Sequence, residues 1–109
     1  MKIYKPKDWT FRNNLKRKNA SNKGGKHPSI VVGEENNKFA NLGLTHAEKR
    51  GHHKNIMLSR NPNPQDKKPS YVRDDLKLDD MKYLKEVLNY KKLPQKDIDK
   101  IMKIINKKR

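Results

Sequence analysis

Hydrophobic residues in the middle of this chain form three short clusters separated by polar residues, glycine and proline. Clusters of this length that are rich in β-branched residues or leucine are typical of strands, which we predict near residues 29–32, 38–45 and 55–58. Residues 34–37 are all polar and predict a turn between the first two strands. Gly43 lies inside the second strand, where glycine marks a bulge or the close approach of other atoms.

Residues 61–69 predict a loop, because their three prolines cannot donate a backbone hydrogen bond to a sheet. Residues 71–72 predict a last short strand, and the hydrophobic spacing then changes to that of a helix. The first predicted helix begins after Asp79 or Asp80, either of which is suited to cap it. Its apolar face consists of Leu84, Val87 and Leu88.

A second helix is predicted to begin at Pro94, because proline is favoured in the first turn of a helix. Asp97 and Asp99 near its start and basic residues at its end suit the helix dipole. Its apolar positions have helical spacing and are Ile98, Ile101, Met102 and Ile105. Strands followed by helices predict an α+β fold, with a small antiparallel sheet or barrel and C-terminal helices.

The charge of the chain indicates an anionic partner. Its 109 residues include 28 Lys and Arg against 12 Asp and Glu, a formal net charge of +16, and residues 1–26 alone balance at +8. We therefore predict a basic, partly flexible N-terminal segment at residues 1–23 and a domain at residues 24–109. Nucleic acid is the first expected partner, because each neutralised phosphate releases counterions. An acidic protein, an anionic membrane surface and simple solubility are the alternatives.

Several classes of protein are excluded by what the sequence lacks. No cysteine occurs, so the chain has no disulfides, thiolate metal sites or cysteine nucleophile. The longest apolar runs are about four residues, whereas a helix that crosses a bilayer needs about 20. The first residues contain no apolar stretch of the kind found in signal peptides. We expect a cytoplasmic protein that does not enter a membrane.

The few aromatic residues have two interpretations. Trp9 and Phe11, together with Leu15, are expected to attach a strand or a short helix to the domain. Tyr4 and Tyr71, like Trp9 and Phe11, are also candidates to stack on nucleic-acid bases. In a protein with so few aromatic residues, packing in the core is the simpler role for most of them.

All four histidines fall within one stretch of 27 residues: His27, His46, His52 and His53. A histidine metal site of this kind usually includes carboxylate or thiolate ligands, and the nearest acid, Glu48, does not complete a His-Glu-x-x-His pattern. We therefore expect no metal and no other cofactor.

Proton transfer is the sharper interpretation of these histidines. His27 directly precedes the first predicted strand, and Thr45 and His46 end the second. If the two strands are neighbours, the three side chains face one cleft and form the candidate catalytic group. RNA cleavage without metal needs a base for the 2′-hydroxyl, donors for the phosphate and an acid for the leaving oxygen. The alternative is a basic loop that only holds phosphates. The residues expected to bind nucleic acid are Lys16, Arg17, Lys18, Lys23, Lys26, Arg50, His52, His53 and Lys54.

Short blocks of the sequence resemble the PemK/MazF-like toxins. Residues 24–32 look like the Gly-rich loop that leads through Arg-Pro into an apolar strand in that family. Residues 42–46 resemble its second block, a strand that ends in a functional Thr, and residues 50–58 resemble its third strand. Residues 88–105 are similar to its closing helices, so the resemblance covers about residues 24–105.

The resemblance implies a small SH3-like barrel, usually dimeric, that cleaves single-stranded RNA without metal and is restrained by an acidic antitoxin. The catalytic Thr of the family falls on Thr45, and the position of its catalytic Arg falls on His27. This is a departure, because Arg is a permanent, forked phosphate ligand and His is not. The first strand of the family is not visible, and a Lys-rich stretch stands in its place. The sequence thus predicts either such an endoribonuclease or a non-catalytic barrel that binds nucleic acid or an acidic protein surface, such as a mobile-element inhibitor of a nucleic-acid machine.

Overall fold

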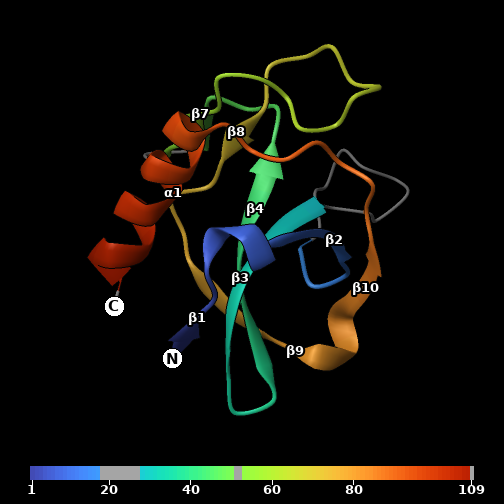
Figure 1. Cartoon of the computed structure of the whole chain (residues 1–109), viewed down its shortest axis with the longest axis vertical. Coiled ribbons are helices and arrows are strands. Elements are labelled where there is room, and N and C mark those ends of the chain that lie inside the picture. The colour runs from blue at the N-terminus through green and yellow to red at the C-terminus, as the bar shows by residue number, and fades with distance from the viewer. Residues whose placement is uncertain (18–27, 51–52, 109) are drawn as a thin grey trace.

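A long β-hairpin of β3 (Pro28–Glu35) and β4 (Lys38–Thr45) forms the centre of the fold (Figure 1). The computed structural model describes residues 1–17, 28–50 and 53–108. The strands join through Asn36 and Asn37, whose φ angles of 46° and 64° are those of a two-residue hairpin turn. The two predicted strands are confirmed, and the turn is shorter than expected because residues 34–35 belong to β3.

The sheet extends from both sides of this hairpin and is antiparallel throughout. The strands on the β3 side are β1 (Lys2–Ile3), β2 (Thr10–Asn14) and, beyond β2, β10 (Leu84–Val87). The strands on the β4 side are β9 (Lys77–Asp80), β8 (Tyr71–Val72) and, beyond β8, β7 (Ile56–Met57). The predicted strands near residues 55–58 and 71–72 are confirmed. A separate two-stranded ribbon consists of β5 (Lys49–Arg50) and β6 (His53–Lys54).

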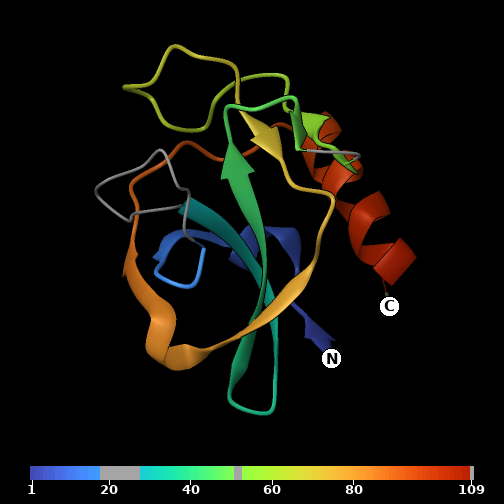
Figure 2. The ribbon, with the colours of Figure 1, turned by 180° about the vertical axis from the view of Figure 1, so that it is seen from behind.

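The eight-stranded sheet is open, with β10 and β7 at its two ends. Its β3 and β4 sides are nevertheless joined by the chain, because β9 continues through the short helix η2 (Met81–Tyr83) into β10 (Figure 2). The observed architecture is thus a small α+β domain with an antiparallel sheet and one C-terminal helix among the described residues.

Helix α1 (Gln95–Lys108) lies to one side of the sheet (Figure 1), and its buried isoleucines share one core with residues of the β3–β4 hairpin. The helix begins one residue after the predicted start, and the carbonyl of Pro94 accepts hydrogen bonds from the backbone N–H groups of Asp97 and Ile98. Ile101 is fully buried, and Met102 packs at the edge of the core. The residues of the core are Phe11, Ile30, Val32, Ala40, Leu42, Leu44, Leu58, Val72, Ile101, Ile104 and Ile105.

The prediction of a helix after Asp79 or Asp80 is wrong, because this part of the chain forms two strands. Residues 77–80 pair with β4 and residues 84–87 pair with β2, so their backbone groups bond to other strands. Asp80 does act as a cap, since its side chain accepts a hydrogen bond from the Lys82 backbone N–H at 3.0 Å, but it caps only the single turn of η2. A non-local pairing has overridden a local helical spacing.

The N-terminal segment contributes strands to the same sheet. Between β1 and β2 lies a single turn, η1 (Pro6–Asp8), and Phe11 on β2 is buried in the core. The predicted attachment through Trp9 and Phe11 is confirmed, because Trp9 packs against the core, whereas Leu15 is exposed. The expected boundary near residue 23 lies outside the described residues. No helix in the described part of the chain is long and apolar enough to cross a membrane.

Candidate nucleic-acid interface

Thr45 and His46 lie at the C-terminal end of β4, beside β8. Thr45 is paired with Tyr71, and its hydroxyl oxygen accepts a hydrogen bond from the Ala47 backbone N–H at 3.1 Å. This bond leaves the hydroxyl proton of Thr45 free to be donated to a ligand. The side chain of His46 is 54% exposed, so a ligand can reach it.

His46 is hydrogen-bonded to Asp66. Its Nε2 lies 2.6 Å from Oδ2 of Asp66, on the loop of residues 61–69. The pKa of Asp66 is lowered, first by the backbone N–H of Lys68 and further by His46, so this carboxyl is ionised near neutral pH. A carboxylate only accepts hydrogen bonds, so Nε2 of His46 carries the hydrogen. The neutral imidazole therefore has its lone pair on Nδ1, the nitrogen that can take a proton from a substrate.

Local hydrogen bonds hold Asp66 in place. Asn61, Asn63 and Asp66 each accept a bond from the backbone N–H two residues further on, at 2.9 to 3.0 Å. Such turns are the preferred local structure of Asn and Asp, which explains why this proline-rich stretch is ordered. The carbonyl of the buried Pro62 accepts a bond from the backbone N–H of Lys91 at 2.8 Å. The predicted loop is confirmed, and it forms a fixed support for Asp66.

The basic ribbon of β5 and β6 begins three residues after His46. Asn55 connects this ribbon to the segment that follows His46. Its side chain donates to the carbonyl of Ala47 at 2.8 Å, and its backbone N–H donates to the carbonyl of Glu48 at 2.9 Å. Lys49 and Lys54 are exposed and are directly opposite each other in the ribbon. Like charges in this arrangement repel one another, and a bound anion relieves the repulsion.

The structure brings several of the predicted site residues to this end of the hairpin. Thr45 and His46 end β4, and Lys54 precedes Asn55, which bonds to Ala47 directly after His46. β5 and β6 pair the backbones of Arg50 and His53. β3 and β4 are neighbours, as the catalytic prediction required, and Ser29 pairs with Gly43, so β3 begins at the end where β4 finishes. His27, Lys18, Lys23, Lys26 and His52 lie outside the described residues.

Arg17 is not part of the exposed basic surface. Its side chain is buried, with Nε donating to Oδ1 of Asn41 at 2.8 Å and Nη2 to the Asn41 carbonyl at 3.1 Å. Burial lowers its pKa, and the charges of Asp79 and Asp75 oppose this effect. Asn14, Asn41 and Asp79 complete the same buried network. We therefore assign Arg17 a structural role in place of the predicted phosphate contact. Lys16, beside it, is exposed, with its Nζ 5.1 Å from the ring centroid of Tyr83.

Sequence reasoning missed Asp66, the acidic partner of His46. It lies 20 residues from His46 in the chain, and nothing in the local pattern relates the two positions. The one available signal was the single acid within a loop rich in Asn and Pro. Among the described residues, no group of three or more His, Asp or Glu side chains is placed to hold a metal ion.

Comparison with known proteins assigns no family: no family model matches the chain, and no curated protein matches its sequence. The function must therefore be argued from the chain's own residues. The residues that carry the argument are Thr45, the His46–Asp66 pair and the ribbon of β5 and β6.

Proposed function

We propose that this protein binds single-stranded RNA and cleaves it without a metal ion, as PemK/MazF-like toxins do. The observation that carries the proposal is the hydrogen-bonded His46–Asp66 pair at the end of β4, beside Thr45 and the basic ribbon. An imidazole with an oriented ring and a free Nδ1 is a suitable general base for a 2′-hydroxyl. The lysines of the ribbon supply the charge that holds the phosphate backbone.

Each group then has a defined task. Nδ1 of His46 takes the proton of the 2′-hydroxyl, whose oxygen attacks the adjacent phosphorus and expels the 5′ oxygen of the next nucleotide. The leaving oxygen takes a proton from solvent, and the products are a 2′,3′-cyclic phosphate and a 5′-hydroxyl. Asp66 stabilises the imidazolium formed in the first step, because it is ionised and in contact with the ring. The hydroxyl of Thr45 donates to a phosphate oxygen, where negative charge develops.

The fold supports the relation to this family in two respects. A hairpin strand ends in Thr45, and an amphipathic C-terminal helix packs on the sheet. We infer that the open sheet, whose two sides are joined through η2, is a divergent SH3-like barrel.

Incubation with long single-stranded RNA in EDTA tests the proposal. Discrete fragments that end in cyclic phosphates are expected, and His46→Ala should reduce cleavage by about 100-fold or more while binding is retained. Lys67→Ala, an exposed substitution in the same loop, is the matched control and should leave the rate unchanged. RNA that stays intact with the unaltered protein would contradict the catalytic proposal.

A non-catalytic binder of RNA is the second candidate function. The opposed Lys49 and Lys54 favour it, because their repulsion calls for an anionic partner but requires no chemistry. In that case RNA binds in a salt-dependent manner and is not cut, and His46→Ala has little effect on affinity.

A further inference from the structure

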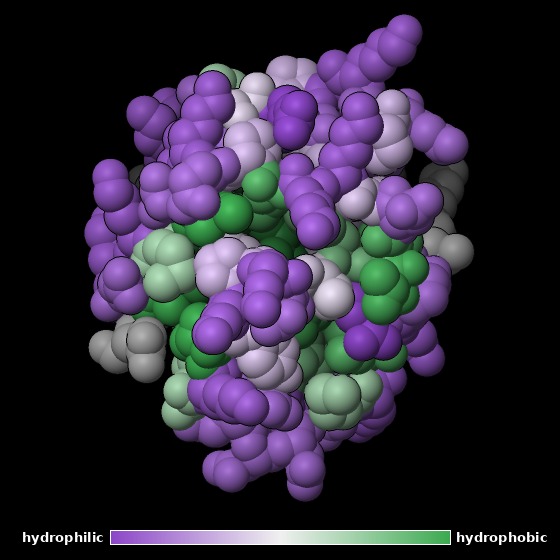
Figure 3. Space-filling view, in the orientation of Figure 1, coloured by the Kyte–Doolittle hydropathy of each residue, from purple (hydrophilic) through white to green (hydrophobic). Residues whose placement is uncertain are grey.

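A groove of about 710 Å³ lies between the N-terminal residues 5–11 and the segment that leads from β10 to α1. Figure 3 shows this face of the molecule, where apolar residues in a hollow are bordered by hydrophilic side chains. The groove has the size of a typical pocket for an organic ligand, and most of its lining is apolar. Such a surface on so highly charged a protein indicates a binding site.

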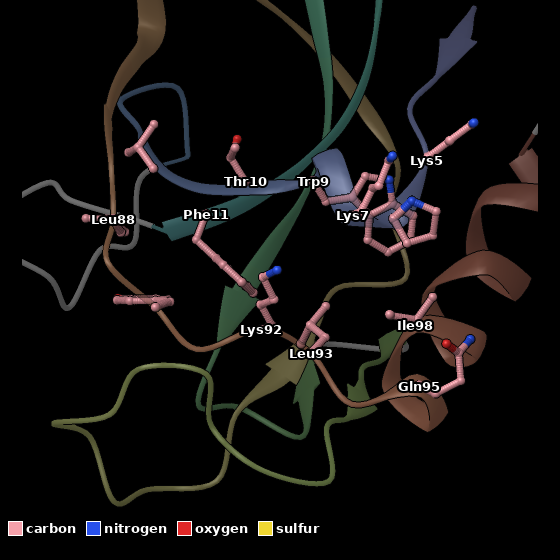
Figure 4. A pocket seen from close by; sticks show the side chains of 13 residues that line it. Lys5, Lys7, Trp9, Thr10, Phe11, Leu88, Lys92, Leu93, Gln95 and Ile98 are labelled. Carbon is pink, nitrogen blue, oxygen red and sulfur yellow. The ribbon is translucent and has the colours of Figure 1, made fainter.

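Aromatic rings line this groove on both sides. Phe11 and Tyr90 lie together, with ring centroids 5.3 Å apart and an angle of 43° between the ring planes. Trp9 lines the N-terminal side, as Figure 4 shows. Its Nε1 donates to the carbonyl of Tyr4 at 3.0 Å, so the only polar atom of the indole is already satisfied within the protein. The rings are thus suited to stack on a flat ligand.

Lysines border the groove from two different parts of the chain. Lys5 and Lys7 belong to the N-terminal side, and Lys92 comes from the segment before α1 (Figure 4). All three are exposed. Amines around an aromatic surface fit a ligand that is flat and apolar at its centre and carries negative charge on each side. A nucleotide within a strand has this form, with a base between two phosphates.

The groove is connected to the His46–Asp66 pair through the loop of residues 61–69. The carbonyl of Pro62 in this loop accepts a hydrogen bond from the backbone N–H of Lys91, next to Tyr90, at 2.8 Å. Burial raises the pKa of the Tyr90 phenol, and the charge of Asp66 raises it further. The side chain of Asn63 forms a hydrogen bond with Tyr90. The same loop therefore supports the candidate catalytic pair on one side and the wall of the groove on the other.

We propose that a nucleobase of the bound RNA strand occupies this groove, stacked on Trp9 and Tyr90 above the buried Phe11, with its neighbouring phosphates on Lys5, Lys7 and Lys92. The inference rests on the proposed binding of RNA and is independent of cleavage. An acidic peptide with apolar side chains is the competing occupant. The base is favoured because aromatic rings line both sides of the groove. The loop that carries Asp66 also contacts the groove wall, since the Pro62 carbonyl bonds to the backbone of Lys91, next to Tyr90.

Trp9 is the only tryptophan in the chain, so its fluorescence reports on the groove directly. A ten-nucleotide RNA should quench this emission in the His46→Ala variant, which keeps the strand intact. A strand of equal length without bases should bind about fivefold or more weakly and leave the emission nearly unchanged, since stacking contributes about 1–3 kcal/mol per base.

Two charge reversals one residue apart provide a matched comparison. Lys92→Glu should weaken RNA binding by about fivefold or more, because it removes a phosphate contact and adds a repulsive charge. Lys91→Glu makes the same change outside the groove lining and should weaken binding by no more than about twofold. Equal effects of the two variants would overturn the proposal.

The outcomes separate this proposal from the proposed function. RNA that binds without quenching Trp9, or that quenches it no more than the strand without bases, overturns the groove assignment alone. Quenching by RNA without cleavage by the unaltered protein supports the groove and overturns only catalysis. A synthetic peptide of Glu and Leu that quenches Trp9 at lower concentration than RNA would show that the groove docks a protein, and the base assignment would be wrong.

Discussion

Gly33 occupies the point where β1 lies closest to β3. A Cβ atom built at this position would collide with the backbone carbonyl oxygen of Lys2. The backbone of Lys2 cannot move away from the added atom without breaking the pairing of β1 with β3. A side chain of any size at Gly33 therefore disturbs the sheet. Gly43 differs, because the atoms nearest to a Cβ there are side-chain atoms of Arg17 and Arg73, at 3.0 to 3.1 Å. The expected close approach at Gly43 is confirmed.

Gly33→Ala should therefore destabilise the protein by about 1–3 kcal/mol. Gly43→Ala is the matched control and should cost less, since flexible side chains can shift by a few tenths of an ångström. Denaturant unfolding of the two variants measures the difference. A smaller loss for Gly33→Ala than for Gly43→Ala would show that β1 does not constrain this position.

Asp66 makes the stability of the protein depend on pH in a defined direction. Its pKa is lower in the folded protein than the usual value of about 3.9, mainly through the Lys68 backbone N–H. A carboxyl of this kind stabilises the fold above that usual value, and the contribution is lost as the pH falls through the lowered pKa.

Asp66→Asn should consequently lower the Tm at pH 7, and the difference from the unaltered protein should shrink toward zero as the pH falls through the lowered pKa of Asp66. Thermal unfolding between pH 2 and pH 7 provides the measurement. Asp8→Asn, an exposed change in η1, controls for the loss of one negative charge. A Tm difference for Asp66→Asn that is the same at every pH would contradict the assignment.

Among the elements, the ribbon of β5 and β6 combines, under the proposed function, a cost in stability with a gain in RNA binding. Lys49→Glu places an opposite charge across from Lys54 and should stabilise the ribbon by about 0.2–1 kcal/mol. The same change should weaken RNA binding and reduce the slope of log affinity against log salt by about 0.7. Stability and binding thus change in opposite directions.

Unfolding and filter-binding experiments on Lys49→Glu test this relation. Lys103→Glu, which changes an exposed lysine on α1, supplies the matched control and should leave the salt slope nearly unaltered. If both variants bind RNA equally well, the ribbon is not part of the interface.

The elements that could be predicted from sequence are those whose signal is local. The β3–β4 hairpin has a polar turn between two hydrophobic runs, and α1 has a proline start and an apolar stripe. Residues 84–88 misled the prediction, because an apolar spacing of three and four residues over so short a stretch is shared by a helix and a strand. Only the distant β2 decides between them.

The residues of the candidate site also divide into those with a local sequence signal and those placed by distant contacts. Thr45 and His46 are neighbours in the chain at the end of a recognisable strand, so the sequence was sufficient to place them together. Asp66 contacts His46 from a distant loop, and Tyr90 lines the groove from another. The side chain of Arg17 is buried because it bonds to Asn41. These three roles depend on tertiary contacts that no local pattern encodes.

At the scale of the whole molecule, the net charge of +16 affects folding and binding in opposite ways. Salt screens repulsion among the lysines, so the Tm should rise between about 20 and 200 mM NaCl, over which the screening length shortens about threefold. RNA affinity should fall over the same range, because counterion release becomes less favourable. Repeating both measurements in KCl excludes effects specific to sodium, and a Tm that falls with salt would contradict this account.

The pairing of β2 with β10 also bears on how the protein is made. The side chain of Asn13 bonds to that of Glu86, 73 residues later in the chain, and α1, which completes the core, follows β10. A chain emerging from the ribosome can form the β3–β4 hairpin early, because its contacts are local. It cannot complete the sheet until β10 has been synthesised, and it cannot cover the apolar face until α1 has followed. The protein therefore acquires its folded surface, and any activity toward RNA, only after α1 has left the ribosome.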